Sequence, residues 1–362
     1  MATSIPHVPP GHDGVGTGDL NLDFTIIDTG NLSIGTQQLP AGVTFDTSPQ
    51  MCPNNMPVCP ELAVLHANNV TISGNPVRVT GPRPLVIIAG GIVTISTVLD
   101  ASAQGQTPGA GGSAAGMGSG AGSPGVHTGT YSDSGGGGAG FAANGSSGGD
   151  ARGEMFPANG GMGGPQYDDP PVMVLLGGSG GGAGSRGGCT TAPNGGAGGG
   201  AIQISSRISI TIAPGGGIDV GGGGGGAGQA CGGTSNASAG GGGGSGGVVF
   251  LHAPMVTNAG TLAANGGGGG SGAGGSPPGH EGQDGQMSAS VATGGMATDA
   301  YSGAGGNGAA GSTASMAGPT VQTMFGGDGG GGGGSVGRIR ILRQSGSTGN
   351  GTFSPPAVIG NY

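Results

Sequence analysis

Short runs of apolar residues alternate with polar residues at several places along the chain. The clearest examples are Ile202-Gln-Ile-Ser205 and Ile208-Ser-Ile-Thr-Ile212, in which every second side chain is branched and apolar. A period of two places these side chains on one face, as in a half-buried β-strand, whereas a helix needs a period of about 3.6 residues. The pattern therefore predicts an all-β protein built from short strands.

These strands recur as blocks of three apolar stretches. The blocks cover residues 84–103, 201–220 and 248–264, and a fourth block at 337–353 matches only in its first stretch. Too few turn residues separate the stretches for hairpins within a block, so we expect each stretch to stack in parallel on the next block. This predicts a parallel β-helix, or solenoid. An antiparallel β-sandwich with glycine-rich loops is the alternative.

The residues before the first block extend this prediction towards the N-terminus. Residues 62–79 resemble one more coil, and residues 20–34 are expected to supply strands that cap the N-terminal edge. Such a cap is needed because an open sheet edge leaves backbone groups unpaired. We therefore expect an N-terminal extended segment and cap at 1–60 and a β-solenoid core at 61–362.

Glycine divides the chain into two kinds of segment. It contributes 99 of the 362 residues, and most of these glycines lie in inserts at 105–200, 215–247 and 266–334. The branched apolar residues gather in the blocks between the inserts. Collagen is excluded because glycine does not occupy every third position. Each insert begins after the third stretch of one block and ends before the next block, so the inserts should emerge on one side of the core.

The inserts could be flexible linkers, as glycine-rich and serine-rich chains often are. They also contain residues that a linker does not need, such as Phe141, Leu175 and Tyr301. We therefore favour inserts packed as polyglycine II-like extended helices, because a missing side chain lets neighbouring backbones approach and hydrogen-bond. Ordering one residue costs about 1–2 kcal/mol and a hydrogen bond returns only about 0.5–1.5 kcal/mol, so nearly all amides must be paired.

The glycine tracts also support a resemblance. Gly195-Gly-Ala-Gly-Gly-Gly200 and Gly240-Gly-Gly-Gly-Gly-Ser-Gly-Gly247 resemble the repeats of PE-PGRS surface proteins and, more loosely, the polyglycine II bundles of springtail antifreeze proteins and phage tail adhesins. The alternation of strands and glycine tracts resembles glycine-rich β-helical exported proteins of bacteria. This resemblance is compositional, covers residues 62–345, and implies a β-helical protein at a cell surface.

Four cysteines fall into two pairs. Cys52 and Cys59 flank a hexapeptide that contains two prolines, a spacing that a small disulfide loop can span. Cys189 and Cys231 lie in the inserts on either side of the second block, where neighbouring inserts should run side by side. We predict two disulfides and an oxidising compartment. A zinc site is the weaker alternative, because its four ligands would come from distant loops without any Cys-x-x-Cys spacing.

The predicted location is outside the cell or on its surface. The first residues show neither the basic start nor the apolar segment of a signal peptide, so we expect a removed signal or another export route. Asn69 and Asn236 match the acceptor pattern for N-glycosylation. We expect no membrane span, because the longest apolar runs are far shorter than about 20 residues.

Acidic residues are scattered, and few could form a catalytic site. Asp100 and Asp219 take equivalent positions in two blocks and could stack, although each could simply close a turn by accepting hydrogen bonds from nearby amides. Asp168 and Asp169 are adjacent, so in a strand they would face opposite ways, and Pro170 makes a turn the better interpretation. The net charge of −9 and the small number of aromatic residues argue against nucleic-acid binding.

Patterns that could bind a metal are isolated. Gly216-Gly-Ile-Asp219 and Gly326-Gly-Asp328 approximate a calcium-binding glycine repeat, but they do not recur in tandem. His66 and His252 take equivalent positions at the ends of two first strands, and we expect a stacked surface pair rather than a metal site. We therefore predict no catalytic residue, no metal and no cofactor.

The sequence favours a non-catalytic exported structural or cell-surface protein, such as a scaffold, an adhesin or the subunit of a fibre. Its expected partners are copies of itself or a surface glycan. Two alternatives remain. One is an ice-binding protein, suggested by regular, uncharged threonine and serine surfaces. The other is a carbohydrate-active β-helix enzyme, which would need acidic residues gathered in one groove.

Overall fold

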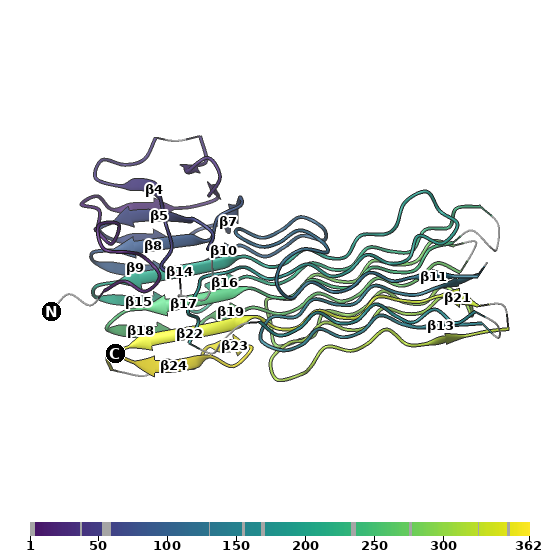
Figure 1. The fold of residues 1–362 in the computed structure, drawn as a ribbon. Helices are drawn as coiled ribbons and strands as arrows, with labels where there is room; N and C mark the ends of the chain where they lie inside the picture. The colour runs from purple at the N-terminus through teal and green to yellow at the C-terminus, as the bar shows by residue number, and fades with distance from the viewer. Residues whose placement is uncertain are drawn as a thin grey trace.

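The computed structural model describes residues 4–36, 38–52, 59–129, 131–153, 156–167, 171–232, 237–274, 277–324, 326–345 and 348–362. Over these residues the protein is all-β and has no helix, as the alternating pattern predicts. The strands form three large sheets, and within each sheet they follow one another from the N-terminal to the C-terminal end of the molecule (Figure 1). Two small sheets lie at the far end of a lobe.

The first large sheet is parallel throughout the described residues, in the order β1-β6-β9-β15-β18. Its strands are β1 (Leu20–Leu22), β6 (Val70–Ile72), β9 (Ile92–Ile95), β15 (Ser209–Ile212) and β18 (Met255–Asn258).

The second and third sheets are parallel except at the N-terminal edge, where β2–β3 and β4–β5 are antiparallel. The second contains, in spatial order, β23 (Thr352–Ser354), β19 (Thr261–Ala263), β16 (Gly217–Asp219), β10 (Val98–Asp100), β7 (Val77–Thr80), β2 (Ile26–Asp28) and β3 (Ser33–Ile34). The third contains β24 (Val358–Asn361), β22 (Arg338–Arg343), β17 (Val248–His252), β14 (Ala201–Ser206), β8 (Leu85–Ala89), β5 (Leu62–Ala67) and β4 (Thr44–Ser48).

The chain visits the three sheets in a fixed order. Each block places its first stretch in the third sheet, its second in the first sheet and its third in the second sheet, as β8, β9 and β10 do. The next block repeats this order one strand further along, in parallel register. An antiparallel sandwich is therefore wrong for these strands. The fourth block differs because, after β22, the chain next forms a strand in the second sheet, β23.

The inward side chains of all three sheets meet in one apolar core. Val93, Ile204 and Ile218 have no exposed surface, and each comes from a different sheet. Burying one such side chain contributes about 1.5–3 kcal/mol. The third sheet is also covered on its outer face, where Phe141 and Leu175 from the first insert pack on it. This explains why β5, β8 and β17 are almost continuously apolar rather than alternating.

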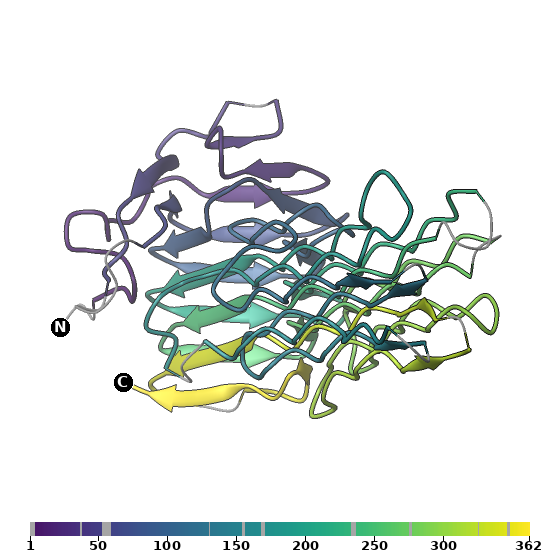
Figure 2. The same cartoon turned by 45° about the vertical axis from the view of Figure 1, so that its right-hand side comes forward.

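The three inserts leave the sheets after β10, β16 and β19 and run side by side into one lobe, as Figures 1 and 2 show. The expectation that they emerge on one side is therefore met. Two small sheets lie at the far end of the lobe. They contain β11 (His127–Thr128), β12 (Ser132–Asp133) and β21 (Gly327–Asp328) in one sheet, and β13 (Ala151–Arg152) and β20 (Val321–Gln322) in the other.

Backbone hydrogen bonds join the glycine tracts in a three-residue period. In the tract 240–247, three successive residues donate to three different tracts, and the fourth residue returns to the first of these tracts. The donors and acceptors, at 2.8–3.1 Å, are Gly240 to Gly329, Gly241 to Gly226, Gly242 to Gly182, Gly243 to Gly332, Gly244 to Gly223, Ser245 to Ser179 and Gly246 to Ser335. The tract runs parallel to 329–335 and antiparallel to the other two.

The glycine positions of the same tract have no room for side chains. A Cβ atom added at Gly242 would lie 2.1 Å from the carbonyl oxygen of Gly137, and one added at Gly243 would lie 2.1 Å from that of Gly267. Both contacts are with backbone, which cannot move aside as a side chain can. Glycine is therefore required here by the close approach of neighbouring backbones.

Candidate functional site

A row of threonines crosses the outer face of the first sheet. Thr71, Thr94, Thr211 and Thr257 share one register position on four consecutive strands, and this set is called the threonine row below. Their neighbours along each strand point inward and are buried. Adjacent strands in a sheet are about 4.7–4.9 Å apart, so the hydroxyl groups repeat at that spacing.

The surface around the threonine row is uncharged. None of the five strands of this sheet contains an acidic or basic residue. The four threonines are half-buried, and none of their hydroxyl groups bonds to another residue that the structure describes. The signal in the sequence is a Val-Thr-Ile or Ile-Thr-Ile triplet around three of these threonines and Val-Thr-Asn around Thr257, but their common register emerges only in the folded chain.

Asp100 and Asp219 are direct neighbours in the second sheet, as their equivalent positions predicted. Each accepts a hydrogen bond from the backbone amide two residues later, Ser102 for Asp100 and Gly221 for Asp219, both at 2.9 Å. The two residues therefore stack on neighbouring strands, and each also closes a turn by accepting a hydrogen bond from a nearby amide.

The two carboxyl groups differ in charge environment. Arg78, on the neighbouring strand β7 of the same sheet, donates to the Asp100 carboxylate at 2.6 Å. Asp219 forms no ion pair with a described residue and is only 8% exposed. Burial, followed by the nearby charge of Asp100, raises the pKa of Asp219 to about 7.

A second buried carboxyl pair lies at the far end of the lobe. Asp133 on β12 and Asp328 on β21 are partners in a parallel pair, and both are buried. Ser185 donates to Asp133 at 2.5 Å, and the ring Nδ1 of His127 lies 2.9 Å from the same carboxylate oxygen. Burial, followed by the Asp133 and Asp299 carboxyl groups, raises the pKa of Asp328 to about 8.

In the sequence, Asp328 stands out only as the last residue of Gly326-Gly-Asp328, an isolated approximation of a calcium-binding glycine repeat. Within the described part of the chain, no group of three or more His, Cys, Asp or Glu side chains is placed to hold a metal ion. The pairing of Asp133 with Asp328 was not predicted, because the two residues are far apart in the sequence and belong to no repeat.

The predicted stacked pair of His66 and His252 is wrong. The two residues share a register position, but Ile88 and Ser205 on two intervening strands separate them. His252 is buried rather than on the surface, and burial lowers its pKa to about 4. Their equivalent places in the repeat give them one register position, but β8 and β14 lie between their two strands.

Of the other residues singled out in the sequence, one is hydrogen-bonded within the fold and three lie outside the described residues. The Asn69 side chain donates to Asp19 and accepts from the Ile92 amide, so its amide group is occupied within the fold. Asp168, Asp169 and Asn236 lie outside the residues that the structure describes.

Both predicted disulfides are formed. Cys52 is bonded to Cys59, and Cys189 is bonded to Cys231, with Cα atoms 6.0 and 5.4 Å apart respectively. The second bond links two inserts through cysteines that are 42 residues apart in the sequence. Two disulfides are typical of proteins that work in an oxidising environment.

Comparison with known proteins found no matching family model, no matching curated protein and no matching solved structure. Within the described ranges, no helix is long and apolar enough to cross a membrane.

Proposed function

We propose that the protein is a non-catalytic structural module of an exported or cell-surface assembly. In this proposal the three sheets are the faces of a parallel β-helix, and the inserts form a rigid slab of polyglycine II-like helices attached to it. The observation that carries the proposal is the three-residue period of the hydrogen bonds made by residues 240–247.

That period has a direct physical meaning. A polyproline II helix has three residues per turn and no internal hydrogen bonds, so its amides point outward in three directions. A tract whose amides reach three neighbours in rotation has the geometry expected of such a helix in the interior of a bundle. Close contact of backbones, as at Gly242, then leaves no room for water or for a side chain at these glycine positions.

The distribution of chemical groups supports a mechanical role rather than catalysis. Asp219 and Asp328 are buried among backbone and other carboxyl groups, and Asp100 is paired with Arg78. The disulfide between Cys189 and Cys231 ties two inserts together within the slab. A bonded slab on a stacked core resists bending, which suits a spacer or scaffold exposed to the surroundings of a cell.

Hydrogen exchange followed by mass spectrometry tests the architecture. Peptides from 238–247 and 328–336 should exchange as slowly as peptides from β14 and β17, because their amides are bonded and excluded from water. Exchange at the rate of an unstructured glycine peptide would contradict the proposal.

Antibody labelling of intact producing cells tests the location, and signal only after the cells are broken would count against surface exposure.

The threonine row supports a second candidate function, ice binding. Hydroxyl and methyl groups repeated at strand spacing on an uncharged face suit contact with ordered water. The test compares thermal hysteresis of the wild type, the variant Thr94→Lys with Thr211→Lys, and the control Thr44→Lys on the exposed face of β4. Activity in the wild type and control but not in the double variant is expected. Wild-type activity equal to that of buffer would exclude this function.

A further inference from the structure

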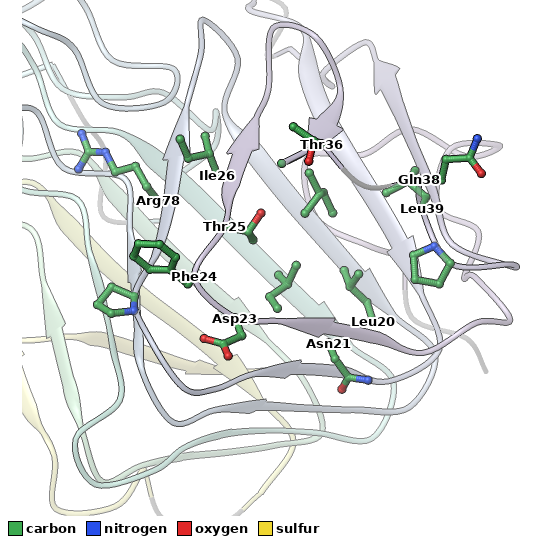
Figure 3. A pocket seen from close by; sticks show the side chains of 15 residues that line it. Leu20, Asn21, Asp23, Phe24, Thr25, Ile26, Thr36, Gln38, Leu39 and Arg78 are labelled. Carbon is green, nitrogen blue, oxygen red and sulfur yellow. The ribbon is translucent and has the colours of Figure 1, made fainter.

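A cavity of about 550 Å³ opens at the N-terminal end of the sheets. It lies between β1, β2 and the segment that follows β3 (Figure 3). This size falls within the range of about 300–1,000 Å³ that is usual for small-molecule sites. No pattern in the sequence predicted it, because the lining residues come from several turns of the chain.

The floor of the cavity is apolar. Leu20, Leu22 and Ile34 line it, and all three are buried members of the core. They make the cavity a continuation of the core surface at the end of the stack. A ligand that enters it must therefore present an apolar face.

The rim of the cavity carries an exposed aromatic side chain. Phe24 is 81% exposed, and its backbone has a φ of +40°, in the left-handed region that bulky residues rarely adopt. Figure 3 shows its ring on the side of the cavity opposite Gln38 and Leu39. Both the exposed ring and its backbone conformation cost free energy, and such outliers gather at binding sites. The fold holds Phe24 at the rim rather than packing it in the core.

The charges around the cavity limit the ligand. The Arg78 guanidinium is taken up by Asp100 and by the Ser102 carbonyl, so it cannot hold an anion without losing these bonds. The exposed Asp23 carboxylate is held in place by the backbone amide of Asn75 at 2.8 Å. Among the described residues of the lining, the one cation is already paired and the one carboxylate is negative, which disfavours phosphates, sulfates and acidic sugars.

We propose that this cavity binds a neutral sugar unit of a glycan. A pyranose ring has an apolar C–H face and hydroxyl groups on its edge. Its face would lie against Phe24 and the apolar floor, and its hydroxyl groups would bond to the side chains of Thr25 and Thr36, which line the same cavity. A glycan would thus be a partner of the structural module proposed above. The biological role of this sugar site rests on that proposed function, but sugar binding itself does not.

Isothermal titration calorimetry tests this assignment with neutral hexasaccharides of glucose, mannose, xylose and N-acetylglucosamine, and with hexagalacturonate as the acidic probe. At least one neutral probe should bind the wild-type protein at about 1 mM or below. Phe24→Ala should weaken this binding by about tenfold or more, because the sugar loses the apolar contact that the aromatic ring provides. Hexagalacturonate should bind more weakly than the neutral probe.

The matched control is Tyr301→Ala, which removes a 48% exposed aromatic ring from the lobe next to β21. It should leave sugar binding unchanged, and circular dichroism should show that both variants fold. No binding of any neutral probe, equal binding by Phe24→Ala, or tighter binding of hexagalacturonate would each overturn the assignment. Because hydrogen exchange of the glycine tracts does not depend on sugar, failure here is distinguishable from failure of the structural proposal.

Discussion

Asp100 and Asp219 are register partners on neighbouring parallel strands, yet among the described residues Asp100 forms an ion pair, with Arg78, and Asp219 forms none. The carboxyl group of Asp219 is buried against a like charge, so its pKa is raised to about 7. Asp219 in the folded protein therefore keeps its proton at pH values where the unfolded chain has lost it. This difference links the stability of the junction between sheets and lobe to pH.

The first prediction concerns the substitution Asp219→Asn. Because the folded pKa exceeds the unfolded value near 4, the unfolding free energy should fall as the pH rises from about 4 to about 7, by at most about 4 kcal/mol. The amide keeps the acceptor for Gly221 and cannot ionise, so the variant should show a smaller pH dependence than the wild type and be more stable than it at pH 8. Urea denaturation between pH 4 and 8 measures it. Asp46→Asn, at an exposed site, is the control and should retain the wild-type profile.

A second prediction concerns the far end of the lobe. Asp328 has its pKa raised to about 8, so the stability that its protonated form contributes should be lost progressively between about pH 4 and pH 8. Hydrogen-exchange protection factors of peptides containing Asp133 and Asp328 should fall over this range, relative to those of β17. Asp328→Asn should remove the fall. Equal pH dependence in the variant and the wild type would show that another group is responsible.

A third prediction tests the need for glycine in the slab. Gly242→Ala places a methyl group 2.1 Å from the Gly137 carbonyl oxygen, so it should destabilise the protein by about 2 kcal/mol or more and raise exchange in the neighbouring tracts. Gly14→Ala is the matched control, because a Cβ atom at Gly14 meets nothing within 4 Å. Similar stabilities for the two variants, by chemical denaturation, would contradict a tightly bonded slab.

The disulfides give a fourth prediction. Loop-closure entropy makes a long cross-link more stabilising than a short one, with about 4 kcal/mol expected for the Cys189–Cys231 loop and about 2.5 kcal/mol for the Cys52–Cys59 loop. Replacing both cysteines of a pair by serine should therefore cost more for the first pair. Thermal unfolding of the two double variants, each without its own bond, measures the difference. The reverse order would indicate strain or residual structure in the denatured chain.

Local patterns predicted much of the core. Alternation in residues 202–212 identified strands, because side chains in a strand point to opposite faces in turn. The spacing of the repeated blocks also predicted that Asp100 and Asp219 become neighbours, since equivalent residues of successive blocks fall in register. The pairing of Cys189 with Cys231 followed from the same repeat, which brings neighbouring inserts side by side, and the pairing of Cys52 with Cys59 followed from their short spacing.

The sequence by itself thus determined the strands, their repeated order and the place of the glycine inserts, because these depend on residues close together in the chain. Only the tertiary structure decided which glycine tracts bond to one another, because glycine has no side chain to distinguish one partner from the next. It also decided the burial of Asp328 beside Asp133 and the position of Phe24 over a cavity, since both depend on segments distant in sequence that meet only when the whole chain is packed.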